Sequence, residues 1–190
     1  IFGGLSFYQR KEIKDVIAYY RVIVNPDDEE ALKRIINYPA RGIGSTTVDK
    51  ISACAAEHHV SLWQIITHPT EHGLAVNRGT LGKLAQFAQL IETFRGSLDE
   101  QDADQLGQAV IKESGIYADL CQGTDVEALA RRENVEELMS SLSEFVDGRR
   151  EEGREENVGL ADFLQEVSLL SDQDSDDGDD DKVNLMTVHA

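Results

Sequence analysis

The sequence is poor in cysteine, proline and aromatic residues, and each shortage excludes a class of protein. It has only 2 cysteines, Cys54 and Cys121, far apart in the chain. They form no disulfide framework, so we expect a reducing compartment. With 3 prolines and 6% aromatic residues, the composition is typical of a helical protein rather than a β-sandwich. No run of 18 apolar residues and no basic-then-apolar leader occur, so we expect a soluble, cytoplasmic protein.

Basic residues are also scarce, but the resulting negative charge is unevenly distributed. The chain has 18 Lys and Arg against 36 Asp and Glu, a net charge of −18. Residues 1–95 have 11 basic and 10 acidic residues, a net of +1, whereas residues 96–190 have 7 and 26, a net of −19. Since phosphate repels acidic surfaces, only the second half argues against nucleic acid as a partner. The first half can therefore carry a local nucleic-acid surface.

No complete catalytic or metal-binding motif is present. The segment RGTLGKL lacks the first glycine of a phosphate-binding loop and the hydroxyl residue after Lys83. If Gly178 is aligned with the sixth position of a calcium loop, both the first carboxylate and the final glutamate are missing. We therefore expect no nucleotide cradle and no calcium site.

Two pairs of cysteine and histidine residues have a spacing that could place ligands on one helical face. They are Cys54 with His58, and His68 with His72. Neither pair belongs to a zinc-binding pattern, which needs about four ligands. The favoured interpretation is a buried cysteine and surface histidines.

Apolar periodicity predicts an almost all-helical body. Residues at helical spacing form the groups Ile13, Ile17, Tyr20 and Val24; Val48, Ile51 and Ala55; Leu81, Leu84, Ala88, Ile91 and Phe94; Leu106, Val110 and Ile111; Leu138, Leu142 and Phe145; and Leu160, Phe163, Leu164 and Val167. Capping-box spacings occur at Ser6 and Gln9, Ser61 and Gln64, and Thr124 and Glu127. Asn25-Pro26 should end the first long helix. The acidic run SDQDSDDGDDDK is expected to be a linker, and KVNLMTVH alternates as a strand.

The segment NYPARGIGSTTVDK, residues 37–50, places a glycine-rich loop between two helices. Gly42 and Gly44 can adopt positive φ and allow another backbone to approach, while Ile43 can anchor the loop. Amides at the following helix N-terminus attract phosphate, and Arg41 and Lys50 add positive charge. Two interpretations stay open. One is a helix-hairpin-helix contact to a DNA backbone, and the other is a tight turn with a threonine N-cap.

A second, weaker candidate lies in HGLAVNRGTLGKL. Here Arg78, Gly79, Thr80 and Lys83 again place glycine, a hydroxyl and basic groups at a helix start. Taken alone, this pattern is more typical of a plain N-terminal cap.

Three blocks together resemble the UvrD/PcrA/Rep family of superfamily 1 DNA helicases. GGLSFYQRKEIKDVIAYYRVIVNPDDEEALKRIINYPARGIGSTT resembles the family pattern over its whole length, and VNLMTVHA resembles the start of the family's fifth helicase block. The region between them suits the accessory 2B domain, which is inserted into the second motor domain, 2A. The resemblance implies a mainly α fold with helix-hairpin-helix-like turns, flanked by short α/β remnants of the RecA-like 2A domain.

The resemblance also implies a division of the chain and a function. Residues 1–35 would belong to 2A, 36–172 to 2B, 173–182 to an acidic linker, and 183–190 to the returning 2A strand. Because the chain begins at Ile1 and ends within a strand pattern, we expect a fragment of an ATP-dependent 3′–5′ DNA helicase of the bacterial cytoplasm. The fragment itself should lack ATPase activity and should bind no cofactor or metal. ATP and Mg²⁺ belong to the full-length protein.

The implied partners are duplex DNA, the junction between single strand and duplex, the rest of the motor and regulatory proteins, with no membrane. Gly42, Ile43, Gly44 and Thr46 match the family's DNA-contacting hairpin. The other expected DNA-binding residues are Asn37, Arg41, Lys50, Arg78, Thr80, Thr187 and His189. The alternative is a protein-interaction domain that acts through the acidic second half.

Overall fold

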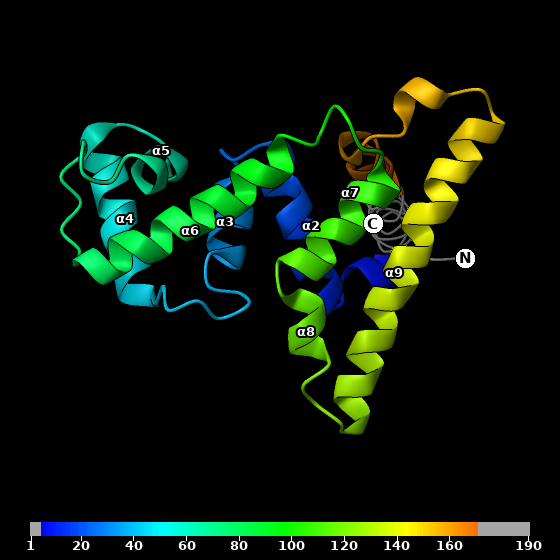
Figure 1. The fold of residues 1–190 in the computed structure, drawn as a ribbon, viewed down its shortest axis with the longest axis horizontal. Coiled ribbons are helices and arrows are strands. Elements are labelled where there is room, and N and C mark those ends of the chain that lie inside the picture. The colour runs from blue at the N-terminus through cyan, green and yellow to red at the C-terminus, as the bar shows by residue number, and fades with distance from the viewer. Residues whose placement is uncertain (1–4, 171–190) are drawn as a thin grey trace, which may run out of the picture.

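The computed structural model describes residues 5–170, and within this range it is mainly helical with no strand (Figure 1). This confirms the predicted mainly α fold. The elements are α1 (Leu5–Tyr8), α2 (Lys11–Val24), α3 (Glu29–Ile35), α4 (Ser45–His58), α5 (Leu62–Thr67), α6 (Arg78–Arg95), α7 (Ala103–Glu113), α8 (Ile116–Leu120), α9 (Val126–Glu151) and a 3₁₀ helix (Glu155–Asn157). A last helix occupies 160–170.

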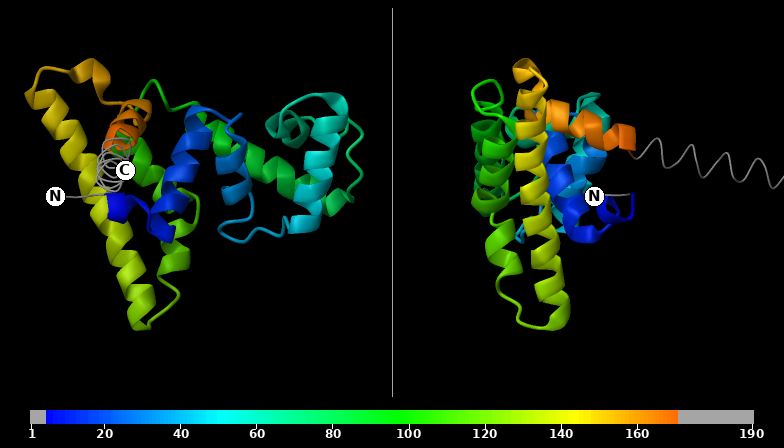
Figure 2. Two further views of the ribbon diagram at one scale, coloured as in Figure 1. Left: turned by 180° about the vertical axis from the view of Figure 1, so that it is seen from behind. Right: turned by 90° about the vertical axis from the view of Figure 1, so that its right-hand side faces the viewer.

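The helices form an elongated body with two ends (Figures 1 and 2). Helices α4 and α5, with the start of α6, make one end, and α7, α8 and α9 make the other. Helix α2 lies between them and packs against α3, α6, α7 and α9. It is therefore the central helix of the described chain.

Two neighbouring tyrosines of α2 are fully buried and link it to both ends of the body. The Tyr20 hydroxyl donates a hydrogen bond of 2.9 Å to the carbonyl of Gly107 in α7. The Tyr19 hydroxyl donates to the carbonyl of Tyr38, which precedes α4. One hydrophobic cluster includes residues from α1 through the last helix. The hydrophobic core is thus continuous across residue 35, and the division of the chain there stays a prediction.

Several helix ends lie where the sequence predicted them. Asn25 ends α2 as its C-cap residue. Ser61 caps α5, since its hydroxyl accepts the amide of Gln64 at 3.2 Å. The predicted inner face of α9, which includes Leu138 and Leu142, is buried.

Two predicted capping boxes were wrong, and one short helix was missed. Ser6 lies inside α1, and the longer helix α2 begins only after Arg10, which makes no side-chain cap. Asp125 rather than Thr124 caps α9, because its carboxylate accepts the amide of Ala128 at 2.9 Å. Helix α8 has only 5 residues, too few to produce a helical stripe.

Some predictions fall outside the described range. They are the linker at 173–182, the strand at 183–190, and the site residues Thr187 and His189. Within residues 5–170, none of the helices combines the length and the apolarity needed to cross a bilayer.

The contact between α7 and α9 depends on a glycine, so we expect Gly107→Ala to destabilise the fold. A Cβ built on Gly107 would lie 2.7 Å from Leu142 Cδ1 and 3.0 Å from the Tyr20 hydroxyl oxygen. Overpacking costs about 1–3 kcal/mol, which outweighs the gain of about 1 kcal/mol in helix propensity. The urea midpoint should fall. Gly148→Ala is the control, because its Cβ would meet nothing within 4 Å, and it should be neutral or stabilising. Equal midpoints for both variants would contradict the expected clash.

Candidate nucleic-acid interface

Residues 41–47, called the glycine hairpin below, comprise the end of the loop between α3 and α4 and the first residues of α4. Two residues hold this segment in place. Ile43 is fully buried and anchors the loop in the core, as the sequence predicted. The Asn37 side-chain oxygen accepts the backbone amide of Arg41 at 2.8 Å and that of Ile43 at 3.1 Å. Asn37 therefore fixes the shape of the hairpin through its main chain.

The two glycine positions of the hairpin differ in whether their backbone conformation requires glycine. Gly42 has φ +80, in the left-handed region that favours glycine. Gly44 has φ −81 and ψ 178, an extended conformation open to any residue. A Cβ built on Gly44 would meet nothing within 4 Å. Positive φ thus occurs at only one of the two glycines for which it was expected, and neither backbone nor packing requires glycine at position 44.

The N-terminus of α4 has no side-chain cap. Gly44 is the N-cap residue and supplies no side-chain hydrogen bond, so the alternative threonine cap is not formed. Within the described residues, the amides of Ser45, Thr46 and Thr47 have no hydrogen-bond partner. Free amides and the helix dipole together make this terminus attractive to anions. Lys50 lies four residues after Thr46, so the two side chains share one face of α4.

The second candidate segment, at the start of α6, has a side-chain cap, in contrast to α4. The Asn77 side chain accepts the amide of Thr80 at 2.8 Å, so this backbone amide is already bonded. Arg78 is the first residue of α6 and is exposed. The segment is a capped helix start, and Arg78 offers a basic side chain there.

The fold brings the two candidate segments together through Lys83. A Cβ built on Gly42 would lie 2.7 Å from Lys83 Nζ and 3.0 Å from its Cε, so this lysine lies against the hairpin. The N-termini of α4 and α6 are at the same end of the molecule (Figures 1 and 2). Lys83 was noted in the sequence only as part of the second segment. Its contact with Gly42 depends on how α6 packs, which no local pattern reveals.

Arg41 makes its side-chain contacts within the protein, and the phosphate contact expected for it stays a prediction. Its Nη1 donates to the carbonyls of Ile35 at 2.6 Å and Ile36 at 2.8 Å, and its Nη2 donates to the Tyr19 hydroxyl at 2.6 Å. The guanidinium carbon lies 4.9 Å from the centre of the Phe87 ring. Burial raises the pKa of Tyr19, while Arg41 lowers it. The side chain of Arg41 therefore points into the protein.

Cys54 is buried, as predicted, and its thiol lies 3.3 Å from the carbonyl oxygen of His72. His58 and His68 are exposed, also as predicted. Among residues 5–170 no group of three or more His, Cys, Asp or Glu side chains could hold a metal ion.

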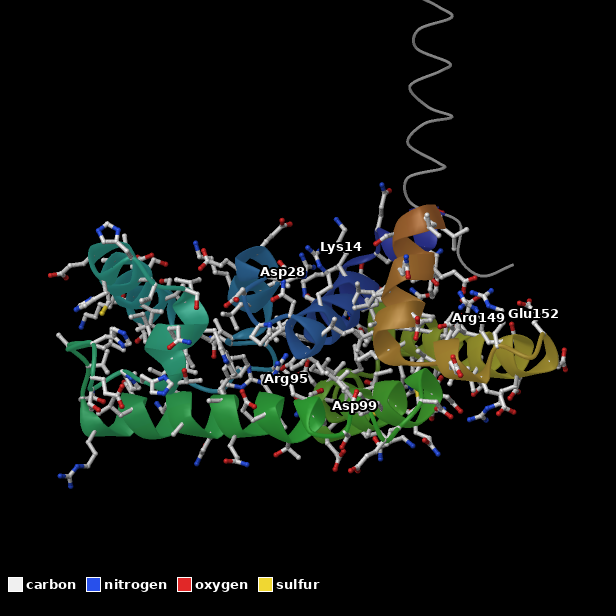
Figure 3. All side chains as sticks on the ribbon, turned by 90° about the horizontal axis from the view of Figure 1, so that it is seen from above. Lys14, Asp28, Arg95, Asp99, Arg149 and Glu152 are labelled. Carbon is white, nitrogen blue, oxygen red and sulfur yellow. The ribbon has the colours of Figure 1, made fainter. Side chains whose placement is uncertain are left out.

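Charge separates the two ends of the molecule. Residues 41–96, which include the hairpin and α4–α6, have 5 basic and 4 acidic residues, a net of +1. Residues 97–170 have 6 and 19, a net of −13. In Figure 3 the labelled Arg149, on α9, and Glu152, its C-cap residue, lie at the end opposite α4 and α5. The hairpin thus lies at the end that repels phosphate least.

An open helix N-terminus beside a lysine, on an otherwise acidic helical protein, is an arrangement suited to contact with a nucleic-acid backbone. Residues 1–190 match the family described as the UvrD-like helicase C-terminal domain, and the chain belongs to this family. It is 35% identical to an ATP-dependent DNA helicase PcrA of Leuconostoc citreum over 99% of the chain. It is 34% identical to PcrA of Bacillus subtilis and 33% identical to DNA helicase II of Haemophilus influenzae, in each case over 100% of the chain.

The chain spans about a quarter of each relative, covering 25% of both PcrA proteins and 26% of DNA helicase II. The match over residues 1–190 confirms the resemblance to UvrD-like helicases at the level of the family. What the relatives do as whole proteins concerns this chain only as a proposal.

Proposed function

We propose that the chain is the 2B accessory domain, with adjoining pieces of 2A, of an ATP-dependent 3′–5′ DNA helicase. In this proposal the glycine hairpin binds phosphates of duplex DNA near the junction with single strand. Membership of the UvrD-like family supports the first part, since its relatives are named as ATP-dependent DNA helicases. The second part rests on the hairpin itself.

Gly44 is the observation that carries the proposed contact. Serine, threonine, aspartate or asparagine would be the usual choice at an N-cap, and each would occupy the free amides of α4. Glycine leaves these amides open, and its missing Cβ leaves the space in front of them empty. A phosphate oxygen needs both features, because backbone amides reach an anion only at close approach. Such a contact positions a duplex without reading its sequence.

Lys83 and Lys50 supply the positive charge for this contact. Lys83 lies against Gly42, and Lys50 is exposed one turn into α4. The acidic residues of 97–170 would repel DNA from the opposite end of the molecule. The resulting binding would be weak, dependent on salt and directed to one end of the domain.

We assign ATP and Mg²⁺ to parts of the full-length protein beyond this chain. The sequence has no complete phosphate-binding loop, and no cluster within residues 5–170 suits a metal ion. Thr187 and His189, outside the described residues, are proposed to belong to the block that couples DNA contact to ATP.

The salt dependence of binding tests the proposed contact. For Lys83→Met we expect weaker binding to duplex with a single-stranded tail. The slope of log Kd against log salt should decrease by about 0.9, because one fewer phosphate would be neutralised. Lys112→Met removes an exposed lysine from α7 and is the matched control, expected to leave the slope unchanged.

The outcome also separates the proposal from the alternative of a protein-interaction domain. Equal slopes for the Lys83 and Lys112 variants would contradict the proposed contact. In that case, binding to a basic protein that depends on acidic residues beyond 96 would favour the alternative.

A further inference from the structure

A chain of hydrogen bonds runs from the central helix to the glycine hairpin. The Tyr19 hydroxyl, fully buried on α2, donates to the carbonyl of Tyr38 and accepts from Arg41 Nη2. Arg41 also donates to the carbonyls of Ile35 and Ile36 at the end of α3. The hairpin is thus connected by polar contacts to both α2 and α3.

These bonds satisfy backbone groups that the fold leaves without helical partners between α3 and α4. The last carbonyls of a helix have no partner within the helix. Arg41 supplies donors to two of them, at Ile35 and Ile36, and Tyr19 supplies one to Tyr38 in the turn that follows. The main chain from α3 to Arg41 is therefore held by these side-chain bonds together with a turn bond from the Tyr38 amide to the Ile35 carbonyl at 3.0 Å.

We infer that Arg41 and Tyr19 are positioning residues, which hold the hairpin amides in place for phosphate without contacting DNA. This inference rests on the proposed function of the hairpin. Arg41 lies directly before Gly42, so its bonds to Ile35, Ile36 and Tyr19 help to hold the backbone that leads to Gly44. To reach a phosphate, the guanidinium would have to leave two carbonyls, a buried hydroxyl and the face of Phe87. Lys83, at the hairpin surface, needs no such rearrangement.

Tyr19→Phe tests the inference, with Tyr20→Phe as a matched control. The two tyrosines are adjacent, fully buried and bonded to one backbone carbonyl each, but Tyr20 bonds to Gly107 in α7, away from the hairpin. Both changes remove one hydroxyl and no charge. We expect Tyr19→Phe to speed hydrogen exchange at the amides of Arg41 and Ile43 by roughly tenfold relative to Tyr20→Phe.

Affinity for tailed duplex supplies the second readout. Tyr19→Phe should weaken binding by roughly threefold to tenfold, because losing the bonds of its hydroxyl to Tyr38 and Arg41 loosens the hairpin, and the salt slope should be unchanged. Arg41→Lys keeps the charge but cannot serve the same carbonyls, so its affinity should fall by a similar factor. If Arg41 instead contacted phosphate directly, Arg41→Lys would retain affinity and Tyr19→Phe would have no effect. That result would overturn the inference.

The exchange measurement needs no DNA, so the two levels of the proposal fail separately. Faster exchange at Arg41 and Ile43 without any binding of duplex would support the positioning role and contradict the proposed function. Equal exchange in the Tyr19 and Tyr20 variants would contradict the positioning role whether or not duplex binds.

Discussion

Replacing Gly44 by valine should leave the chain folded and weaken its binding to duplex DNA. Position 44 is extended and a Cβ there meets nothing within 4 Å, so the folded state accepts a larger residue. The branched side chain would instead occupy the space that a phosphate needs in front of the α4 amides. Removing one charge-assisted hydrogen bond costs about 1.5–3 kcal/mol, so affinity should fall by roughly tenfold to hundredfold.

Fluorescence anisotropy with tailed duplex and with the single strand alone measures this effect. Duplex affinity should fall more than single-strand affinity. Gly148→Val is the control, since its Cβ also enters open space but lies on α9, away from the hairpin. Equal decreases on the two DNAs, or a duplex decrease as large for Gly148→Val, would count against the proposed contact.

Replacing Ile43 by alanine should, unlike Gly44→Val, lower the free energy of unfolding. Ile43 is fully buried, and truncation of a buried isoleucine to alanine costs about 2–5 kcal/mol. Because the same side chain anchors the hairpin, duplex binding should also weaken. Urea unfolding monitored by circular dichroism measures the decrease in stability.

Ile43→Val provides the graded comparison, with an expected cost of about 0.5–1.5 kcal/mol. The Gly44→Val variant should unfold at the midpoint of the unsubstituted chain. Substitutions at Ile43 and Gly44 therefore separate the anchoring of the hairpin in the core from its proposed contact with phosphate. Equal midpoints for Ile43→Ala and Ile43→Val would contradict the buried anchor.

Local patterns predicted much of the fold because they depend on neighbouring residues alone. The apolar stripes of α2, α6 and α9 follow from helical periodicity, and the burial of Ile43 follows from its place between glycines. Helix α8 and the caps of α2 and α9 were not predicted correctly. A five-residue helix has no measurable period, and neighbouring polar residues compete for the cap of α9, where Asp125 replaces Thr124.

The site was less accessible to sequence reasoning because its charges depend on tertiary packing. A basic residue beside a glycine loop can face phosphate or the protein, and Arg41 faces the protein because three carbonyl and hydroxyl acceptors lie within reach. Lys83 reaches Gly42 only because α6 packs beside the hairpin. That the backbone at Gly44 is extended, and so does not itself require glycine, could be learned only from backbone angles.

A duplex contact through the glycine hairpin is tested most directly by mapping amide chemical shifts of the chain by NMR while duplex DNA is added at low salt. Such a contact should produce the largest shifts at Gly44, Ser45, Thr46 and Thr47, with small shifts along α9. Shifts concentrated on α9 or spread evenly over the chain, or no shifts at all, would contradict a duplex contact through the glycine hairpin.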